Sequence, residues 1–163
     1  MENKPIKRSK YLVEFSKDHH ASLLFCWKIK EGLKKNIDLP RITKYINFFW
    51  ERHLKAHFSE EEELLFNQVE DPLCQQGKAE HLLLTEQVNR LNQDKNQAMG
   101  AYVLFEELLN KHIRFEERVL FPYLENILPV SVLDNALEQL LVKHAETYHD
   151  NYPDEFWTKT NDE

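Results

Sequence analysis

The chain has 163 residues, of which 42% are hydrophobic, with only three glycines and six prolines. This length fits one domain, expected over 1–163, that can bury a sizeable core, and the composition is typical of a mostly helical protein. The formal net charge of -7 argues against nucleic acid or an anionic membrane as a partner.

No apolar run reaches the roughly 20 residues that a membrane span needs, and no signal-peptide core follows Met1. The sequence therefore predicts no membrane partner. The two cysteines, Cys26 and Cys74, form neither a CxxC pair nor a disulfide framework. We expect a cytoplasmic protein, and the sequence leaves open a homodimer or another protein partner.

Prolines and turn residues divide the sequence into five periodic segments. In chain order these segments cover about 9–35, 40–70, 77–94, 97–128 and 130–149. The short connections between the first four predict antiparallel neighbours. The sequence thus predicts an all-α fold: an up-down four-helix bundle over about 9–128, with an additional C-terminal helix over about 130–150.

Local signals mark the later part of the chain. Pro122 is expected to kink the fourth segment near its end. Ser131 opens a spacing that resembles a capping box at the start of the fifth segment. The tail over 151–163 is polar apart from Phe156 and Trp157, and we expect it to dock loosely or to fray.

One phrase occurs in both the second and the fourth segments: a histidine, a glutamate four residues later, a second glutamate, then a Leu-Phe pair. The two copies are His57, Glu61, Glu62, Leu65 and Phe66, and His112, Glu116, Glu117, Leu120 and Phe121. In a helix, positions separated by alternating steps of three and four share one face. This spacing places each histidine and its first glutamate on the apolar stripe, where leucines are expected.

The other two long segments also carry a histidine on the apolar face. The predicted stripes are Leu12, Phe15, His19, Leu23 and Cys26 in the first segment, Ile46, Trp50, His53, His57, Glu61 and Leu64 in the second, His81, Leu84, Val88 and Leu91 in the third, and Phe105, Leu109, His112, Glu116, Val119 and Tyr123 in the fourth. All four long helices are therefore expected to direct a histidine into the core.

This combination predicts a buried metal site. A lone histidine on an apolar stripe is usually a satisfied core residue, but two buried carboxylates near four imidazoles need a counter-charge. A metal cation supplies that charge. Glu61 and Glu116 come from opposite helices, so each can bridge two cations. Imidazole and carboxylate donors without thiolate suit iron or manganese better than a closed structural zinc site.

The arrangement resembles the hemerythrin-like, or HHE cation-binding, family, whose pattern is a histidine on the first helix, HxxxE on the second, a histidine on the third and HxxxE on the fourth. The resemblance spans about His19 to Pro122. It implies a four-helix bundle around two carboxylate-bridged iron ions (Fe2+/Fe3+), for which manganese or zinc can substitute. The implied metal ligands are His19, His57, Glu61, His81, His112 and Glu116, with the two glutamates as bridges.

Three further residues are additional or alternative metal ligands: His20, His53 and Glu117. His19 is favoured over His20 because His19 shares the apolar stripe. Asp18 or His20 would then orient a ligand from outside the metal's own donors. His53 lies four residues before a predicted ligand and is an extra donor, a residue that supports the donors from outside, or a satisfied core residue.

The chain departs in two places from hemerythrins that carry oxygen. Thr85 stands four residues after His81, where the carriers have a histidine. Glu117 stands five residues after His112, where they have an aspartate, and it adjoins the stronger candidate Glu116. The resemblance therefore implies the fold and the metal site without implying oxygen transport.

The implied function is a metal-binding protein that binds or senses dioxygen or nitric oxide, or responds to iron or redox state, more than an enzyme. The alternative is a di-iron enzyme that handles peroxide or nitric oxide, or a relative of the iron-sulfur-cluster repair proteins. No nucleophile and base pair stands outside the predicted cluster, so any catalysis would belong to the metal. His144 and His149, in the last segment, are expected to be surface or packing residues.

Overall fold

The computed structural model describes residues 10–93, 98–144 and 150–158. Within these ranges the regular elements are all helical and no strand occurs, as predicted. The elements between the turns are α1 (Val13–Lys34), α2 (Leu39–Phe49), α3 (Lys55–Leu64), the 3-10 turn η2 (Phe66–Gln68), α4 (Pro72–Gln93), α5 (Met99–Phe115), α6 (Phe121–Ile127) and α7 (Val130–Lys143).

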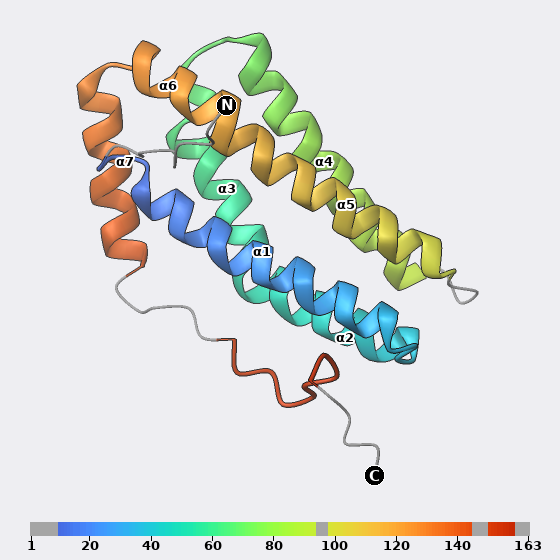
Figure 1. Cartoon of the computed structure of the whole chain (residues 1–163). Helices are drawn as coiled ribbons and strands as arrows, with labels where there is room; N and C mark the ends of the chain where they lie inside the picture. Colours follow the sequence, from blue (N-terminus) through green and yellow to red (C-terminus); the bar gives the residue numbers. More distant parts are fainter. Residues whose placement is uncertain (1–9, 94–97, 145–149, 159–163) are drawn as a thin grey trace, which may run out of the picture.

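Two π-helical turns join shorter helices into longer ones. The turn η1 (Trp50–Leu54) connects α2 to α3, and η3 (Glu116–Leu120) connects α5 to α6. The result is four long helices packed side by side, with α7 beside one end of the bundle (Figure 1). Contacts run around the bundle from α1 to α5, α4, α2 and back to α1, which confirms the predicted four-helix bundle with an additional helix.

The π turns shift the buried face, because each inserts one extra residue into a helical turn. In η3 the amide of Phe121 donates to the carbonyl of Glu116, five residues back. Val119, predicted to face the core, is 45% exposed, whereas Leu120 is fully buried. Pro122 follows immediately and has no N–H to donate, so the irregular turn lies where the kink was predicted.

The predicted stripe of α1 is wrong at one position. Leu23 is 38% exposed, whereas Ser22 is fully buried. The buried face runs through Phe15, His19, Ser22 and Cys26, in alternating steps of four and three. Leu23 therefore lies at the edge of this face, and the position of His19 within it is unchanged.

Two apolar clusters flank a polar layer in the middle of the bundle. Leu12 and Phe15, at the start of α1, belong to one cluster, and Phe25 and Ile29, nearer its end, belong to the other. His19 lies between these pairs on the same helix and is buried. Packing on both sides thus holds the polar layer away from solvent.

The start of α7 differs from the prediction. The helix begins at Val130 after Pro129, and no side-chain hydrogen bond caps it. The capping box predicted from Ser131 is therefore wrong, because Ser131 lies within the first helical turn. The helix ends at Lys143, and the remainder of the predicted segment, 145–149 with His149, lies outside the described residues.

The tail over 150–158 packs more tightly than predicted. Phe156 is 3% exposed and Trp157 is 9% exposed, so the expected fraying is wrong for this stretch. Phe156 fills the space beside Gly32, where an added Cβ would lie 2.6 Å from the phenyl ring. The Nζ atom of Lys28 lies 4.3 Å from the centre of the Trp157 ring, a cation–π contact. Residues beyond 158 lie outside the described part.

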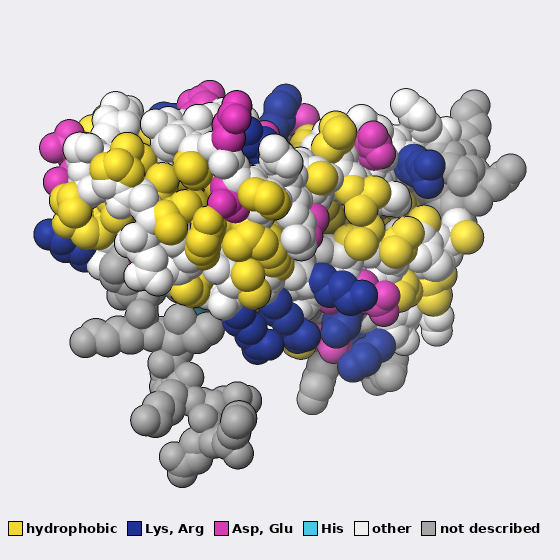
Figure 2. Space-filling model, turned by 90° about the horizontal axis from the view of Figure 1, so that it is seen from above, with side chains coloured by type: hydrophobic (Ala, Val, Ile, Leu, Met, Phe, Trp, Pro, Cys, Tyr) yellow, Lys and Arg dark blue, Asp and Glu magenta, His cyan; other side chains and the backbone are white. Residues whose placement is uncertain are grey.

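Hydrophobic side chains also reach the surface. Figure 2 shows one face of the molecule, on which they lie among Lys, Arg, Asp and Glu side chains while histidines are almost absent. Of the seven histidines in the described residues, five are buried. Among the described helices, none has the length and apolar character required to cross a membrane.

Candidate metal centre

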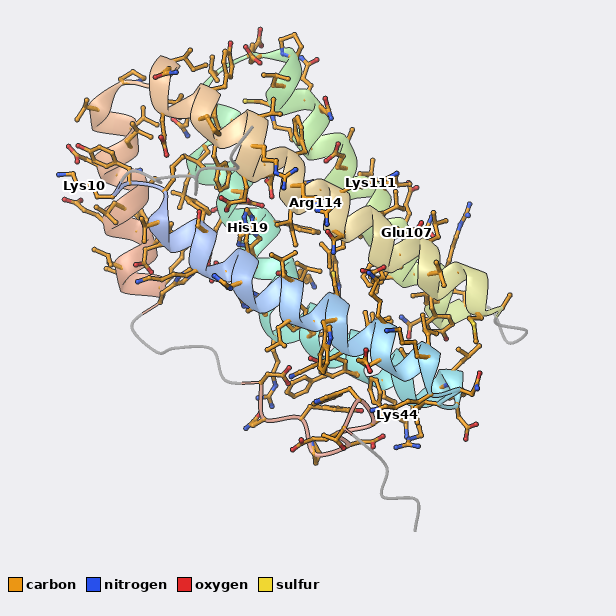
Figure 3. All side chains as sticks on the ribbon, viewed as in Figure 1. Lys10, His19, Lys44, Glu107, Lys111 and Arg114 are labelled. Carbon is orange, nitrogen blue, oxygen red and sulfur yellow. The ribbon has the colours of Figure 1, made fainter. Side chains whose placement is uncertain are left out.

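Each of the four long helices brings a histidine to one buried polar cluster in the middle of the bundle. No member of this cluster is more than 3% exposed. Figure 3 shows His19 inside the bundle, where α1 passes α3. The structure thus brings together all six residues predicted as metal ligands: His19 from α1, His57 and Glu61 from α3, His81 from α4, His112 from α5 and Glu116 from η3.

The carboxylate of Glu61 lies among three imidazoles. Its Oε1 atom is 3.2 Å from Nε2 of His57, one helical turn back, and 3.1 Å from Nε2 of His81 on α4. Its Oε2 atom is 3.4 Å from Nε2 of His19 on α1. Side chains from three helices therefore converge on a single carboxylate.

Glu116 occupies the equivalent place on the opposite side. Its Oε1 atom is 3.0 Å from Nε2 of His112 and 3.1 Å from Nε2 of His19, and its Oε2 atom is 3.8 Å from Nε2 of His81. Two groups of possible metal donors result, and both contain Glu61 and Glu116: one adds His19 and His57, and the other adds His81 and His112.

Despite these short distances, many of the atoms at this convergence form no hydrogen bond of acceptable geometry with the described residues. They are Nε2 of His19, His57 and His112, Oε2 of Glu61, and both carboxylate oxygens of Glu116. A buried polar atom left without a partner costs about 1–3 kcal/mol, and a charged one costs more. Cations between the two carboxylates would satisfy these atoms together, so the residues present fit a pair of metal ions.

Each of the four histidines in the cluster has its second ring nitrogen, Nδ1, on the side away from Glu61 and Glu116. This outer nitrogen also faces a carboxylate. The Nδ1-to-oxygen distances are 2.6 Å from His19 to Glu117, 3.0 Å from His57 to Asp18, 3.1 Å from His81 to Glu62 and 2.7 Å from His112 to Glu80. A neutral histidine that donates its Nδ1–H outward keeps the Nε2 lone pair for a metal. The outer carboxylates therefore favour the tautomer that carries its proton on Nδ1. In this tautomer each of the four Nε2 atoms has a lone pair available to a metal ion.

Of these four outer carboxylates, only Asp18 was predicted to orient a ligand from outside the metal's own donors. Each stands next in the sequence to a predicted ligand and reaches a histidine of a neighbouring helix. The adjacent pairs are Asp18-His19, Glu61-Glu62, Glu80-His81 and Glu116-Glu117. Successive residues of a helix point about 100° apart, so one faces the centre while the other faces the next helix. Glu62 and Glu80 were not predicted for this role, although their adjacency to ligands was a usable signal.

The three alternative ligands lie outside both donor groups. His20 is exposed. His53 is buried, with Nε2 3.4 Å from the backbone oxygen of Asp18, and burial lowers its pKa to about 4, as for a neutral core histidine. Glu117 contacts the outer nitrogen of His19. His53 and Glu117 therefore lie next to the two donor groups and belong to neither.

Positive charge is required at this cluster, and without metal it comes from protons. Burial alone would lower the pKa of His57, but the charge of Glu61 and the hydrogen bond to Asp18 outweigh it and raise that pKa to about 10. Burial is likewise overcome at His112, where Glu116 helps to raise the pKa to about 9. A metal ion that binds here therefore displaces protons from the imidazoles.

Comparison with known protein families agrees with this geometry. The chain matches the family model described as hemerythrin HHE cation binding domain over residues 11–124, which is more than half of its length. The matched region includes all six residues of the buried cluster. No curated protein and no solved structure matches the chain. The chain therefore belongs to the hemerythrin HHE cation binding domain family.

Proposed function

We propose that the protein binds two iron ions in its buried cluster and, at coordination positions left open by the protein, dioxygen or nitric oxide. The observation that carries this proposal is the sharing of Glu61 and Glu116 by two donor groups. Each group supplies only two imidazoles in addition to the shared carboxylates. Sites with few protein donors keep positions free for small molecules.

The chemistry of the donors favours iron. Imidazole nitrogens and carboxylate oxygens suit iron and manganese, and both cysteines are buried elsewhere, so no thiolate joins the cluster. Manganese or zinc can replace iron on the same donors. The bound iron pair would supply reversible changes of oxidation state and binding of a diatomic ligand. The residues of the chain hold the metals and shield them.

Aromatic side chains shield the cluster from water. Phe121 stacks on His19 with ring centres 5.3 Å apart, and Phe58 stacks on His81 at 4.0 Å. Because these contacts also fix the ring planes, they hold the imidazoles in the orientation set by the outer carboxylates. Buried, largely apolar surroundings of this kind favour a small uncharged ligand such as dioxygen or nitric oxide.

The two thiols favour ligand binding over thiol-assisted turnover. Cys26 and Cys74 are both free and buried, and burial raises the pKa of both thiols. Neither is therefore a ready nucleophile or a redox partner for a substrate. Free cysteines also fit the reducing cytoplasm in which we propose that the protein acts. The alternative, an enzyme acting on peroxide or nitric oxide, depends on an external reductant.

The experiment that separates these functions is gas binding to the diferrous protein. Optical spectra recorded on adding dioxygen or nitric oxide, and again after removing the gas, are expected to show bands that form stoichiometrically and reverse. The exposed His20 offers a matched control, since His20→Ala is expected to leave the bands unchanged. Steady consumption of peroxide or nitric oxide with an added reductant, without a reversible complex, would overturn the binding function.

A further inference from the structure

A third group of possible metal donors lies outside the buried cluster, at the junction of α1, α3 and α7. It consists of Asp18, Glu60 and His144, whose donor atoms lie within 4.8 Å of one another. Nε2 of His144 is 3.1 Å from Oε2 of Glu60 and 3.6 Å from Oδ2 of Asp18. The group combines an imidazole with two carboxylates, the donor types of the buried cluster.

These three residues line an open cavity of about 800 Å³. The wall of the same cavity includes His53 and His57. His57 is a donor of the buried cluster, so the cavity extends from solvent to the outer side of that cluster. A cation in this cavity would therefore lie next to His57.

Asp18 connects the outer group to the buried cluster. Its Oδ2 atom lies 3.0 Å from Nδ1 of His57 and 3.6 Å from Nε2 of His144. One carboxylate oxygen thus faces a histidine of the centre on one side and a histidine of the cavity on the other. The Asp18 side chain therefore lies between the two sites and contacts a histidine of each.

Acidic and basic side chains both line the cavity, and the basic ones are Lys17, Arg52 and Lys143. Glu60 is buried, at 7% exposure, and Glu14 adds a carboxylate oxygen 3.9 Å from Nδ1 of His144. Lys17, which also lines the cavity, pairs with Glu14 at 2.8 Å. Asp18 and Glu60 are the carboxylates that face Nε2 of His144, and Asp18 also faces Nδ1 of His57. A divalent cation matches one imidazole and two carboxylates as donors.

The third donor comes from the additional helix. His144 follows the last residue of α7, and its amide donates to the carbonyl of Leu140 at 2.7 Å. The carbonyl end of a helix favours positive charge nearby. Position 144 lies beyond residues 11–124, the part of the chain that matches the family. Asp18 and Glu60 thus lie inside the matched region, and His144 at the end of α7 lies outside it.

We propose that Asp18, Glu60 and His144 form a separate site for a divalent metal ion, which holds the ion in the cavity before it reaches the buried centre. The binding of a cation at this site stands on the outer residues alone. Its role in loading rests on the proposed function of the buried cluster. The outer site is expected to bind more weakly, because it has fewer donors and opens to water.

The position of bound Mn2+ tests the site directly. Crystals of the full chain are soaked in Mn2+, and anomalous scattering locates the ion. A peak among Asp18, Glu60 and His144 in the wild type, lost in His144→Ala and in Glu60→Gln but kept in His20→Ala, is the expected result. Peaks in the buried cluster with none at the outer group would overturn the outer site. A peak at the outer group with none in the buried cluster would contradict the proposed centre and leave this site standing.

The rate of loading tests the role of the site. Metal-free protein is mixed with Fe2+ under anaerobic conditions, and occupation of the buried cluster is followed in a stopped-flow spectrometer. His144→Ala and Glu60→Gln are expected to load several-fold more slowly than His20→Ala while reaching the same final iron content. Equal loading rates in all three variants would overturn the role in loading.

Discussion

Nδ1 of His19 lies 2.6 Å from a carboxylate oxygen of Glu117, although 98 residues separate the two in the sequence. This contact closes a ring of such pairs around the bundle. Asp18 reaches from α1 to a histidine of α3, Glu62 from α3 to α4, Glu80 from α4 to α5, and Glu117 from η3 back to α1. Each long helix thus orients a donor on the next, so the geometry of the centre depends on all four helices together.

The first prediction concerns this ring. Glu117→Gln keeps the size of the side chain but removes its charge. The hydrogen bond that keeps the proton of His19 on Nδ1, and so leaves Nε2 free for metal, is therefore weakened. We expect metal affinity to fall by roughly 10–100-fold, measured by competition with a chelator of known affinity. Glu107→Gln, at an exposed position of the same long helix, is the matched control. Equal affinities in the two variants would show that the outer carboxylate has no influence on the metal.

The second prediction concerns the bridging glutamates. Glu61→Ala removes an oxygen donor from both donor groups, whereas His57→Ala removes a donor from only one of them. We expect Glu61→Ala to lose nearly all bound metal and His57→Ala to retain metal in the group that contains His81 and His112. Metal content per chain is measured by elemental analysis, with circular dichroism to verify that the helices persist. Loss of the same amount of metal from both variants would contradict shared bridging.

The third prediction concerns pH. In metal-free protein, His57 and His112 have folded-state pKa values raised to about 10 and about 9. Groups with a raised folded-state pKa contribute their full stability below the unfolded value, near 6.5, and lose it as pH rises through the folded value. The metal-free protein is therefore expected to become less stable between pH 7 and pH 10.

In metal-loaded protein the imidazoles have already lost these protons, so stability is expected to change much less over the same range. Urea unfolding of both forms at a series of pH values measures the difference. A metal-free protein that is equally stable at pH 7 and pH 10 would contradict the assignment of protons to this cluster.

The fourth prediction concerns the tail. Phe156 is 3% exposed and packs beside Gly32, so Phe156→Ala is expected to lower the free energy of unfolding by about 3 kcal/mol. Metal content is expected to stay unchanged, since Phe156 packs in an apolar cluster that contains none of the donors. Leu24→Ala, at a position that is 49% exposed, is the control and is expected to change stability little. If both substitutions had the same small effect on urea unfolding, the packed tail would be contradicted.

The sequence was sufficient for the fold and for the six residues of the buried cluster. Helical periodicity and the repeated HxxxE phrase require only local geometry, because residues four apart share a face in any α-helix. His57 with Glu61, and His112 with Glu116, were therefore predictable one helix at a time.

Other features depend on the contacts between helices and were missed. The π turn at η3 moved Leu120 into the core in place of Val119, because the hydrogen-bond register changes without any change in apolar content. Glu80 was missed because its partner, His112, lies on another helix. His144 was expected at the surface or in packing, and only the placement of α7 shows that it meets Asp18.

Iron content shows whether the buried cluster binds a pair of iron ions. Protein freed of metal is loaded with ferrous iron under anaerobic conditions, desalted and analysed. We predict two irons per chain and, after exposure to oxygen, absorption bands typical of ligand-to-metal charge transfer. No iron uptake, together with Glu61→Ala and Glu116→Ala variants that are more stable than the wild type, would contradict this prediction. The buried histidines and glutamates would then be structural.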